Sequence, residues 1–454
     1  MSAMKKNVLG TLVSANSGEV ASTVVSRRAG ILTVIGGVLS LAGCGGGGVG
    51  GSGTAADAGA AGISPGDSGA GAVGGGTSVA GVSSGGTGST SVGSVTGFGS
   101  IYLNGGDVRI DDASATVTDE DGVNKKGSLK LGMRVTVVST VSVASDVTAQ
   151  SIVVGGELQG PVDRLSAGNG RFEVLGQKVV VVGGTVFDAS LPNGLLSLGN
   201  GNLVEVHGLL NADRNEITAT FIEKKDNAGV AYFKIQGLVK NLLPGPKEFR
   251  IDNLDIGYAT TPAAGLLATP VEGAYVRLRL NPVPVSNVWQ ATRISGPATT
   301  GQNGSQSEIE GRVTAFNSAT SFAVDGVSVQ TNGATGFDNG QITLASLGSW
   351  VEVKGVMTAG VLVATRVKLE NDSGLATLEY RLTGNLSGLI PITATTGTFS
   401  LRGYTVQFAD AGTPQNPFDR GTLVNLVNGA PVEVRGTAVA GVANTLLATR
   451  IKFL

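Results

Sequence analysis

Residues with reactive or metal-binding side chains are few in this 454-residue chain, which has one cysteine, Cys44, and one histidine, His207. A tetrahedral zinc or copper site needs several such ligands, so no site of this kind is expected. A Ser-His-Asp arrangement would have to use His207, and no Gly-x-Ser-x-Gly elbow accompanies it. We therefore expect no catalytic residue, no metal ion and no cofactor.

Acidic and aromatic residues offer two further candidates, each with a structural alternative. The segment Asp119-Glu120-Asp121-Gly122-Val123-Asn124, near Asp111-Asp112, carries oxygens that calcium could use. The distant glutamate of a full calcium loop is missing, so a polar hairpin turn is the favoured interpretation. Trp289 and Trp350 could stack on sugars, but both lie beside apolar strands, which favours packing in the core.

The segment that precedes Cys44 has the parts of an export signal. Lys5, Lys6, Arg27 and Arg28 make the N-terminal portion positive, and residues 29–42 carry no charge. As a helix, these uncharged residues would rise about 21 Å, which is less than the roughly 30 Å hydrocarbon core of a bilayer. The sequence therefore predicts a cleavable signal over residues 1–43 rather than a permanent transmembrane helix.

The end of this segment, Leu41-Ala42-Gly43-Cys44, resembles the lipobox of bacterial lipoproteins. The resemblance implies cleavage between Gly43 and Cys44, diacylglycerol on the Cys44 sulfur and acylation of the new amine. Several acyl chains together hold a membrane stably. The alternative, a buried structural cysteine, is disfavoured because a run of glycines follows directly.

Two features bear on the route and destination of export. Ser26-Arg27-Arg28 leaves the general and the twin-arginine routes both open. Within the lipoprotein resemblance, the residue after the cysteine influences sorting, and Gly45 is not the aspartate associated with inner-membrane retention. An outer-membrane anchor is therefore expected, with either face open.

Residues 44–90 are almost entirely Gly, Ser, Ala, Thr and Val. Such a segment cannot bury enough apolar surface to offset its ordering entropy, so we expect a flexible tether. Its mean end-to-end distance would be roughly 35–40 Å. The Gly-Lys-Ser/Thr ending of a phosphate-binding loop is missing.

A pattern recurs from residue 91 to the C-terminus and predicts five copies of one β-rich unit. The expected units are residues 91–156, 157–230, 231–304, 305–374 and 375–454. Each opens with a glycine: Gly93, Gly160, Gly237, Gly311 and Gly384. A large apolar residue leads the second strand: Ile101, Phe172, Phe249, Phe322 and Phe399. An apolar residue lies in the closing strand: Ile152, Ile222, Ile294, Val367 and Ile451.

A strand in the second half of each unit, after a threonine-rich turn, alternates apolar and polar residues, as in Val351-Glu352-Val353-Lys354-Gly355. Period two is typical of a half-buried strand, and the final Gly suits a turn with positive φ or a barrel corner. The alternating strands are Met133 to Val137, Leu203 to Val206, Tyr275 to Leu278, Val351 to Val353 and Val432 to Val434. Asn104-Gly105 and Asp325-Gly326 predict hairpin turns.

About five short strands in about 70 residues indicate an all-β chain of small barrels, OB-like or SH3-like, with a small sandwich as the alternative. The third unit is the most divergent, because its many prolines favour longer loops. The residues Gly93 to Ser100, Asn104-Gly105 and Leu129 to Met133 resemble a tandem domain of bacterial lipoproteins that is classed as of unknown function. The resemblance covers residues 91–454, is clearest in the first, second and fourth units, and implies no activity.

The position of His207 within its unit favours an exposed structural role. It follows Val204-Glu205-Val206, and the matching positions in the fourth and fifth units are Lys354 and Arg435. Because charged residues occupy the equivalent sites, we expect His207 at an exposed strand end.

The formal charge of −2 gives no basic surplus to displace the counterions of a nucleic acid, so no nucleic-acid partner is expected. We expect a non-enzymatic envelope protein that acts as an extended scaffold or adhesion/interaction stalk. Its partners would be the membrane, through lipid on Cys44, and envelope polysaccharide or protein. The alternative is a module that binds an oligosaccharide or other envelope polymer, and a hydrolase ranks third.

Overall fold

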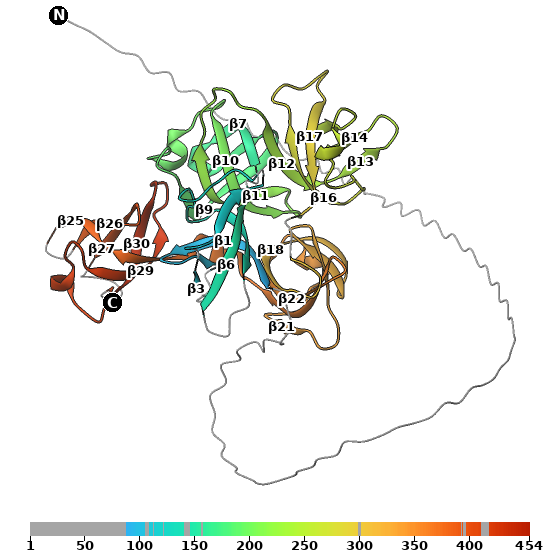
Figure 1. Ribbon diagram of the computed structural model, residues 1–454. Helices are drawn as coiled ribbons and strands as arrows, with labels where there is room; N and C mark the ends of the chain where they lie inside the picture. Colours follow the sequence, from blue (N-terminus) through green and yellow to red (C-terminus); the bar gives the residue numbers. More distant parts are fainter. Residues whose placement is uncertain are drawn as a thin grey trace, which may run out of the picture. The chain divides into compact units, whose positions relative to one another are not determined.

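The computed structural model describes residues 88–104, 109–111, 113–120, 122–139, 146–155, 158–297, 301–391, 393, 396–409 and 417–454. The expected signal segment, the tether up to residue 87, Gly43 and Cys44 lie outside the described residues. The described part is built almost entirely of β-strands, which group into five repeats along the chain (Figure 1).

The strands of the first repeat are β1 (Ser89–Phe98), β2 (Tyr102–Leu103), β3 (Arg109–Asp111), β4 (Thr116–Asp119), β5 (Arg134–Ser139) and β6 (Asp146–Val154). Those of repeat 2 are β7 (Leu158–Ser166), β8 (Arg171–Val174), β9 (Gln177–Phe187), β10 (Leu203–Asn211) and β11 (Glu216–Lys224). Those of repeat 3 are β12 (Phe233–Leu238), β13 (Lys240–Leu243), β14 (Glu248–Ile251), β15 (Leu254–Gly257), β16 (Tyr275–Leu280) and β17 (Trp289–Ser295).

Repeat 4 contains β18 (Gln306–Ser318), β19 (Ser321–Val324), β20 (Val327–Gln330), β21 (Gly336–Asp338), β22 (Trp350–Thr358) and β23 (Val361–Leu369). Repeat 5 contains β24 (Glu379–Asn385), β25 (Ser387–Pro391), β26 (Thr396–Leu401), β27 (Tyr404–Ala409), β28 (Phe418–Asp419), β29 (Pro431–Ala438) and β30 (Thr445–Phe453).

Helices in the described part are short. They are α1 (Asp372–Ala376) and the 3-10 turns η1 (Ala167–Asn169), η2 (Gly194–Ser197), η3 (Ala263–Gly265), η4 (Leu344–Ser346) and η5 (Leu423–Asn425). Within that part, no helix has the length and apolar character needed to cross a membrane.

Strand pairing closes each of repeats 2 to 5 into a barrel of the same topology. In repeat 2, β7 pairs with β8 and β8 with β9, both antiparallel, and β9 then pairs in parallel with β11. The ring closes because β10 pairs antiparallel with both β11 and β7. Five strands in this order, with the third parallel to the fifth, form an OB-like barrel.

The same ring is found in repeats 4 and 5 and in repeat 3, so the prolines of the third unit do not change its topology. Repeat 1 has the corresponding pairs of β1 with β2 and β5, and of β6 with β3 and β5. The expected fold class, tandem small β-barrels, is confirmed.

The interiors of the barrels are filled by the apolar residues that the repeat pattern singled out. The residues that lead the second strand are at most 2% exposed, and those of the closing strand are fully buried. The expected alternating strands coincide with β5, β10, β16, β22 and β29. Period-two patterning thus predicted correctly which side chains face each barrel interior.

The glycines that follow the alternating strands occupy barrel corners and not turns. Gly208, Gly355 and Gly436 lie inside strands, each where the pairing register shifts by a β-bulge. A Cβ on Gly355 would lie 2.2 Å from the carbonyl oxygen of Val363 on the neighbouring strand. Of the two expected roles, the turn with positive φ is therefore wrong, and close approach of backbone at a bend accounts for the glycine.

The opening glycines are required by the hairpin that follows them. Asp325, in the turn between β19 and β20, has φ 45°, and Gly326 has φ 80°, as a type I′ turn demands. The Asp325 side chain folds back over β18, where a Cβ on Gly311 would lie 2.5 Å from its carboxyl carbon. Asn104 has the same left-handed backbone, and its side chain covers Gly93 in the same way.

Repeats that are distant in the sequence share strand edges. Residues 89–92 of β1 pair in parallel with residues 306–309 of β18, and Gly97–Phe98 pair in parallel with Arg381–Leu382 of β24 (Figure 1). Repeat 1 therefore joins repeats 4 and 5 directly. The outer edge of β1 is thus used by two other repeats.

Candidate functional site

The buried side chain of His207 lies where repeat 2 contacts repeat 1. It has no exposed surface, so the expectation of an exposed strand end is wrong. Its Nδ1 accepts a hydrogen bond of 3.2 Å from the backbone N–H of Arg134. The proton must then be on Nε2, which donates to Glu205 Oε1 at 3.2 Å.

The side chain of His207 is buried, whereas those of Lys354 and Arg435 keep exposed surface, because different neighbours cover the strand in each repeat. Lys354 keeps 45% of its side chain exposed beside Glu352 and Glu308. In the middle of β10, repeat 1 instead contacts His207 through the Arg134 backbone, and on the neighbouring β11 Thr220 Oγ1 donates to the Gly132 carbonyl oxygen at 2.6 Å. Equivalent positions in one barrel thus have different surroundings, because the neighbours of the barrels differ.

The carboxyl of Glu205 completes this contact. Burial acts to raise its pKa, but the hydrogen bond from His207 and the charges of Lys234 and Lys225 outweigh burial and hold that pKa well below its usual range. Glu205 therefore remains an anion that is neutralised by lysines of repeats 2 and 3, and not a proton-transfer group poised near neutral pH.

Arg134, at the start of β5, links repeat 1 to repeat 4. Its Nη2 donates to Asp325 Oδ2 at 2.7 Å and to the carbonyl oxygen of Glu310 at 2.9 Å. The residue is 4% exposed, and among the described residues its Nη1 atom has no hydrogen-bond partner. A buried guanidinium with an unused donor is costly unless something accepts from it.

Two acids beside Arg134 are shifted toward their neutral forms. Burial raises the pKa of Glu310 to about 8, although the charge of Arg134 opposes this shift. Burial also raises the pKa of Asp325, again against the charge of Arg134 and the hydrogen bond from the Arg312 backbone. The site therefore combines one strongly held cation with acids that ionise reluctantly.

A cavity of about 1140 Å³ lies beside Arg134, where repeats 1 to 4 meet. Its charged lining consists of Arg134, Arg277 and Arg293 with Glu120 and Asp325. Arg277 is paired with Glu120 of repeat 1, so two of the arginines each have an acidic partner. This volume is slightly above the range of roughly 300–1,000 Å³ that is typical of small-molecule sites.

Neutral side chains make up most of the remaining surface of this cavity, which we call the four-repeat cavity. Gln150, Gln302, Thr136 and Ser295 supply donors and acceptors, and residues such as Val138 and Leu210 supply apolar surface. Such a lining can hold a polar molecule through hydrogen bonds and one or two ionic contacts. Among the described residues, no group of three or more His, Cys, Asp or Glu side chains could hold a metal ion.

The acidic segment after β4 is engaged with the protein itself. Asp119 Oδ1 accepts from the Val123 N–H at 3.0 Å, and its Oδ2 lies 3.5 Å from Lys125 Nζ. Glu120 is paired with Arg277. These contacts support the polar turn over a calcium loop, while Asp112 and Asp121 lie outside the described residues.

Both tryptophans pack against apolar residues, as the favoured interpretation expected. Trp350 is 6% exposed and lies with Leu209 of repeat 2 and Leu375 of α1. Trp289 is half-buried and stacks at a tilt against Phe233, with 6.0 Å between ring centroids. Neither provides an open platform for a sugar ring.

The four-repeat cavity escaped the sequence analysis, although Arg134 carried a signal. In each repeat, the residue directly after the opening glycine pairs with one residue of the alternating strand. In repeats 2 to 5 this strand partner is Leu203, Tyr275, Trp350 or Pro431. Arg134 is the charged member of this set, opposite Ser94. A charge at a position that is otherwise apolar could have marked it for attention.

Three segments of the chain match the family model of a domain of unknown function, DUF5666: residues 159–223, 310–368 and 388–452. They lie in repeats 2, 4 and 5, so the expected tandem domains of unknown function are confirmed. The family model does not match the first unit, for which the sequence predicted a clear resemblance, and it does match the fifth. No curated protein matches the chain.

One solved structure with some likeness is a multidomain protein with nucleic acid binding domains from Streptococcus pneumoniae TIGR4. It is 10% identical, and the match covers 48% of this chain and 72% of that chain, with a TM-score of 0.12. A likeness at this TM-score carries no argument about the fold or the function of this chain.

Proposed function

We propose that this chain is a non-enzymatic, lipid-anchored protein of the bacterial cell envelope whose barrels act together as a scaffold. We infer the lipid anchor from the segment Leu41-Ala42-Gly43-Cys44, which contains the only cysteine of the chain. Acylation of Cys44 would fix the protein to a membrane. Gly45 favours the outer membrane as the destination.

The contacts between repeats support a scaffold with fixed geometry. Shared pairing along β1 and β24, and the single bridge between Lys234 of β12 and Gln159 of β7, tie barrels together through backbone. A scaffold that presents a partner-binding surface benefits from such rigidity, because less freedom is lost on binding. The proposed role is therefore a rigid interaction scaffold rather than an end-to-end stalk.

The anchor is tested by growing cells with an alkyne-tagged palmitate and comparing the wild-type chain with Cys44→Ser. We expect label on the wild-type protein in the membrane fraction, and neither label nor membrane association for the variant. Ser52→Ala, in the same segment, is the matched control and should behave as wild type. A wild-type protein found unlabelled in the cytosol would overturn the proposal.

A second candidate, a module that binds an envelope polymer, is favoured by the four-repeat cavity and its mixed polar lining. The purified full chain should then retain at least one envelope polysaccharide in a pull-down or glycan array. Retention of no polymer would leave the scaffold as the surviving function.

A further inference from the structure

A groove of about 710 Å³ lies between repeats 1 and 5, and we propose that it binds a phosphate monoester, the anionic group of a phosphorylated sugar or of a lipid headgroup. Its charged lining consists of Lys126, Lys130 and Arg402, and no acid is among the described lining residues. The volume lies within the range of small-molecule sites. The inference goes beyond the scaffold and the polymer-binding module and depends on neither.

Contacts between the two repeats fix the position of this groove. Gly97–Phe98 of β1 pair with Arg381–Leu382 of β24. The backbone N–H of Leu131 donates to the Tyr404 hydroxyl at 2.8 Å. The rings of Phe98 and Tyr404, which both line the groove, stack with 6.5 Å between their centroids. The cations of repeats 1 and 5 are therefore brought together by an interface that exists before any ligand binds.

The three cations of the groove are not neutralised by the protein. None of them forms an ion pair in the described part of the chain. Lys126 Nζ donates to the carbonyl oxygen of Ala113 at 3.0 Å, and Arg402 Nε donates to that of Thr383 at 2.6 Å. These bonds orient the side chains and leave further N–H groups, because lysine has three donors and arginine five. Lys126 and Arg402 are exposed and Lys130 is half-buried, so a ligand can reach them.

Lys130 occupies a position at which the other barrels carry no charge. Before each alternating strand, a glycine N–H donates to the carbonyl oxygen two residues after the opening glycine, and these donors are Gly132, Gly201, Gly273, Gly348 and Gly429. Two positions before the donor, repeat 1 has Lys130. The other repeats have Gly199, Val271, Ser346 and Val427 there. Formation of the barrel therefore requires no cation at this position.

Arg402 is likewise the basic member of its set. It lies in the turn between β26 and β27 with φ 52°. The corresponding residues of the other repeats also have positive φ, and they are Asn104, Leu175, Asp252 and Asp325. Asparagine and aspartate accept this backbone conformation more readily than most residues, so the turn itself does not favour arginine. Two positions far apart in the sequence thus carry a charge that their barrels do not require, and both charges line one groove.

A phosphate monoester suits this lining better than a carboxylate or a neutral sugar. It carries a charge of roughly −1.5 to −2 near pH 7 and has three strong acceptor oxygens, so it can engage several cations at once. Lysine binds phosphate as a point charge. A cleft lined by one sign of charge also concentrates ions of the opposite sign. Asn385 and Phe98, which line the same groove, can contact the group that carries the phosphate.

The test is isothermal titration calorimetry on the purified full chain with glucose 6-phosphate, and with glucuronate and glucose as matched ligands. We expect glucose 6-phosphate to bind at least ~10-fold more tightly than glucuronate, because its greater charge adds a further charge-assisted hydrogen bond, and glucose to bind more weakly still. Its affinity should also fall as salt is raised, since the cations are accessible to solvent. Similar binding of the three ligands overturns the inference.

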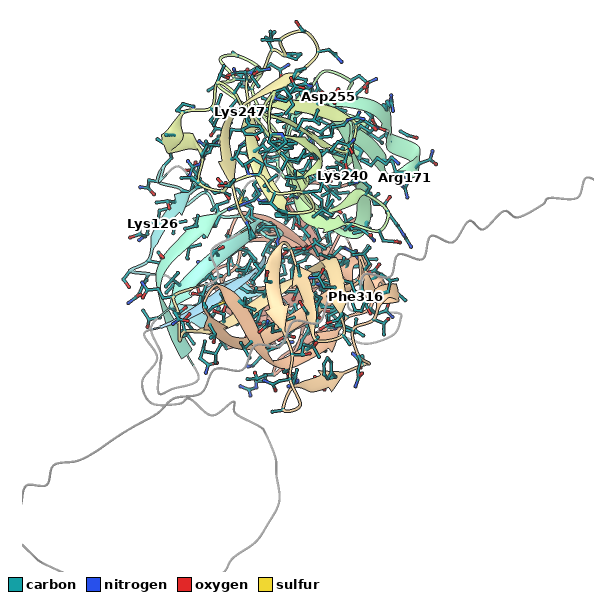
Figure 2. The ribbon with its side chains drawn as sticks, turned by 90° about the vertical axis from the view of Figure 1, so that its right-hand side faces the viewer. Lys126, Arg171, Lys240, Lys247, Asp255 and Phe316 are labelled. Carbon is teal, nitrogen blue, oxygen red and sulfur yellow. The ribbon has the colours of Figure 1, made fainter. Side chains whose placement is uncertain are left out.

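Variants locate the binding. Lys130→Gln and Arg402→Gln should each weaken glucose 6-phosphate, and the double variant should weaken it at least ~10-fold. Lys240→Gln is the matched control, because Lys240 is another exposed lysine without an ion pair among the described residues and lies on β13, away from Lys126 (Figure 2). Thermal unfolding checks that each variant is folded. Binding that survives in the folded double variant, or that Lys240→Gln weakens equally, overturns the assignment to this groove.

Vesicles distinguish the source of the phosphate. Phosphatidylcholine vesicles with and without phosphatidic acid, whose headgroup is a phosphate monoester, are sedimented with the Cys44→Ser chain, so that no acyl chain on the protein contributes. Binding that requires phosphatidic acid and is reduced by Lys130→Gln identifies a lipid headgroup as the ligand. Binding of glucose 6-phosphate alone identifies a free phosphorylated sugar. Binding of neither overturns the inference and leaves the proposed scaffold unaffected.

Discussion

The backbone N–H of Arg134 donates to Nδ1 of His207 across the contact between repeats 1 and 2, at 3.2 Å. Arg134 then uses its side chain to reach repeat 4 through Asp325. Three barrels thus meet at one residue, which explains why the stability of this chain should depend on contacts between repeats as well as on the five interiors.

Replacing His207 should destabilise the protein more than replacing its counterpart in repeat 4. His207→Ala leaves a cavity, an unpaired Arg134 N–H and a Glu205 carboxylate without its donor. We expect a loss of about 2–4 kcal/mol in the free energy of unfolding. Lys354→Ala, at the exposed equivalent position, should cost less than about 1 kcal/mol. Urea denaturation measures both, and equal losses would contradict the contact described here.

The buried acid Glu310 should make stability fall as the pH rises. Its folded pKa is about 8, raised by burial from 4.5, so between these two values the folded state holds a proton that the unfolded state has released. The free energy of unfolding therefore decreases from about pH 4.5 to about pH 8, by on the order of a few kcal/mol.

Glu310→Gln removes this titration and should flatten that part of the profile relative to wild type. Glu379→Gln, in repeat 5 with 45% of its side chain exposed, is the matched control and should keep the wild-type slope. Thermal unfolding at several pH values gives the comparison. A Glu310→Gln profile parallel to that of the wild type would show that Glu310 ionises normally.

The opening glycine of repeat 4 should not tolerate a methyl group. In Gly311→Ala the new Cβ would lie 2.5 Å from the Asp325 carboxyl, which is also held by Arg134 and the Arg312 backbone. We expect a loss of about 2–3 kcal/mol. Gly333→Ala, in a loop of the same repeat with no atom within 4 Å of the new Cβ, should be near neutral. Guanidinium unfolding of both variants checks this difference.

The pair Arg134–Asp325 should show strong energetic coupling. Its members are 4% and 19% exposed, so removing either partner leaves a buried charge at a cost of about 3–5 kcal/mol. In a double-mutant cycle with Arg134→Met and Asp325→Asn, we expect a coupling energy above about 1 kcal/mol. The exposed pair Arg366–Asp338 of repeat 4 should show a much smaller coupling energy, because solvent screens it. Similar values for the two pairs would contradict the role of Arg134 as a buried link.

The interior of each barrel could be predicted from the sequence. Alternation in strands such as Val351 to Val353, and the large residue that leads each second strand, indicate burial because the pleat turns successive side chains to opposite faces. The turn Asp325-Gly326 was predictable for the same local reason, since few residues accept positive φ. These features depend on neighbours only a few residues away.

The surroundings of the outward-facing positions were decided by the tertiary structure. His207, Lys354 and Arg435 are equivalent within a barrel, yet only His207 among them is fully buried, because repeat 1 covers the middle of β10. The burial of Arg134 and the cavity beside it are likewise set by contacts between repeats. Which barrels share an edge depends on complementary outer surfaces of segments more than 200 residues apart, such as β1 and β18, and no local period records that. The sequence alone determined Cys44 as the expected anchor and the five barrels, whereas their joining, and the cavity this creates, came from the folded structure.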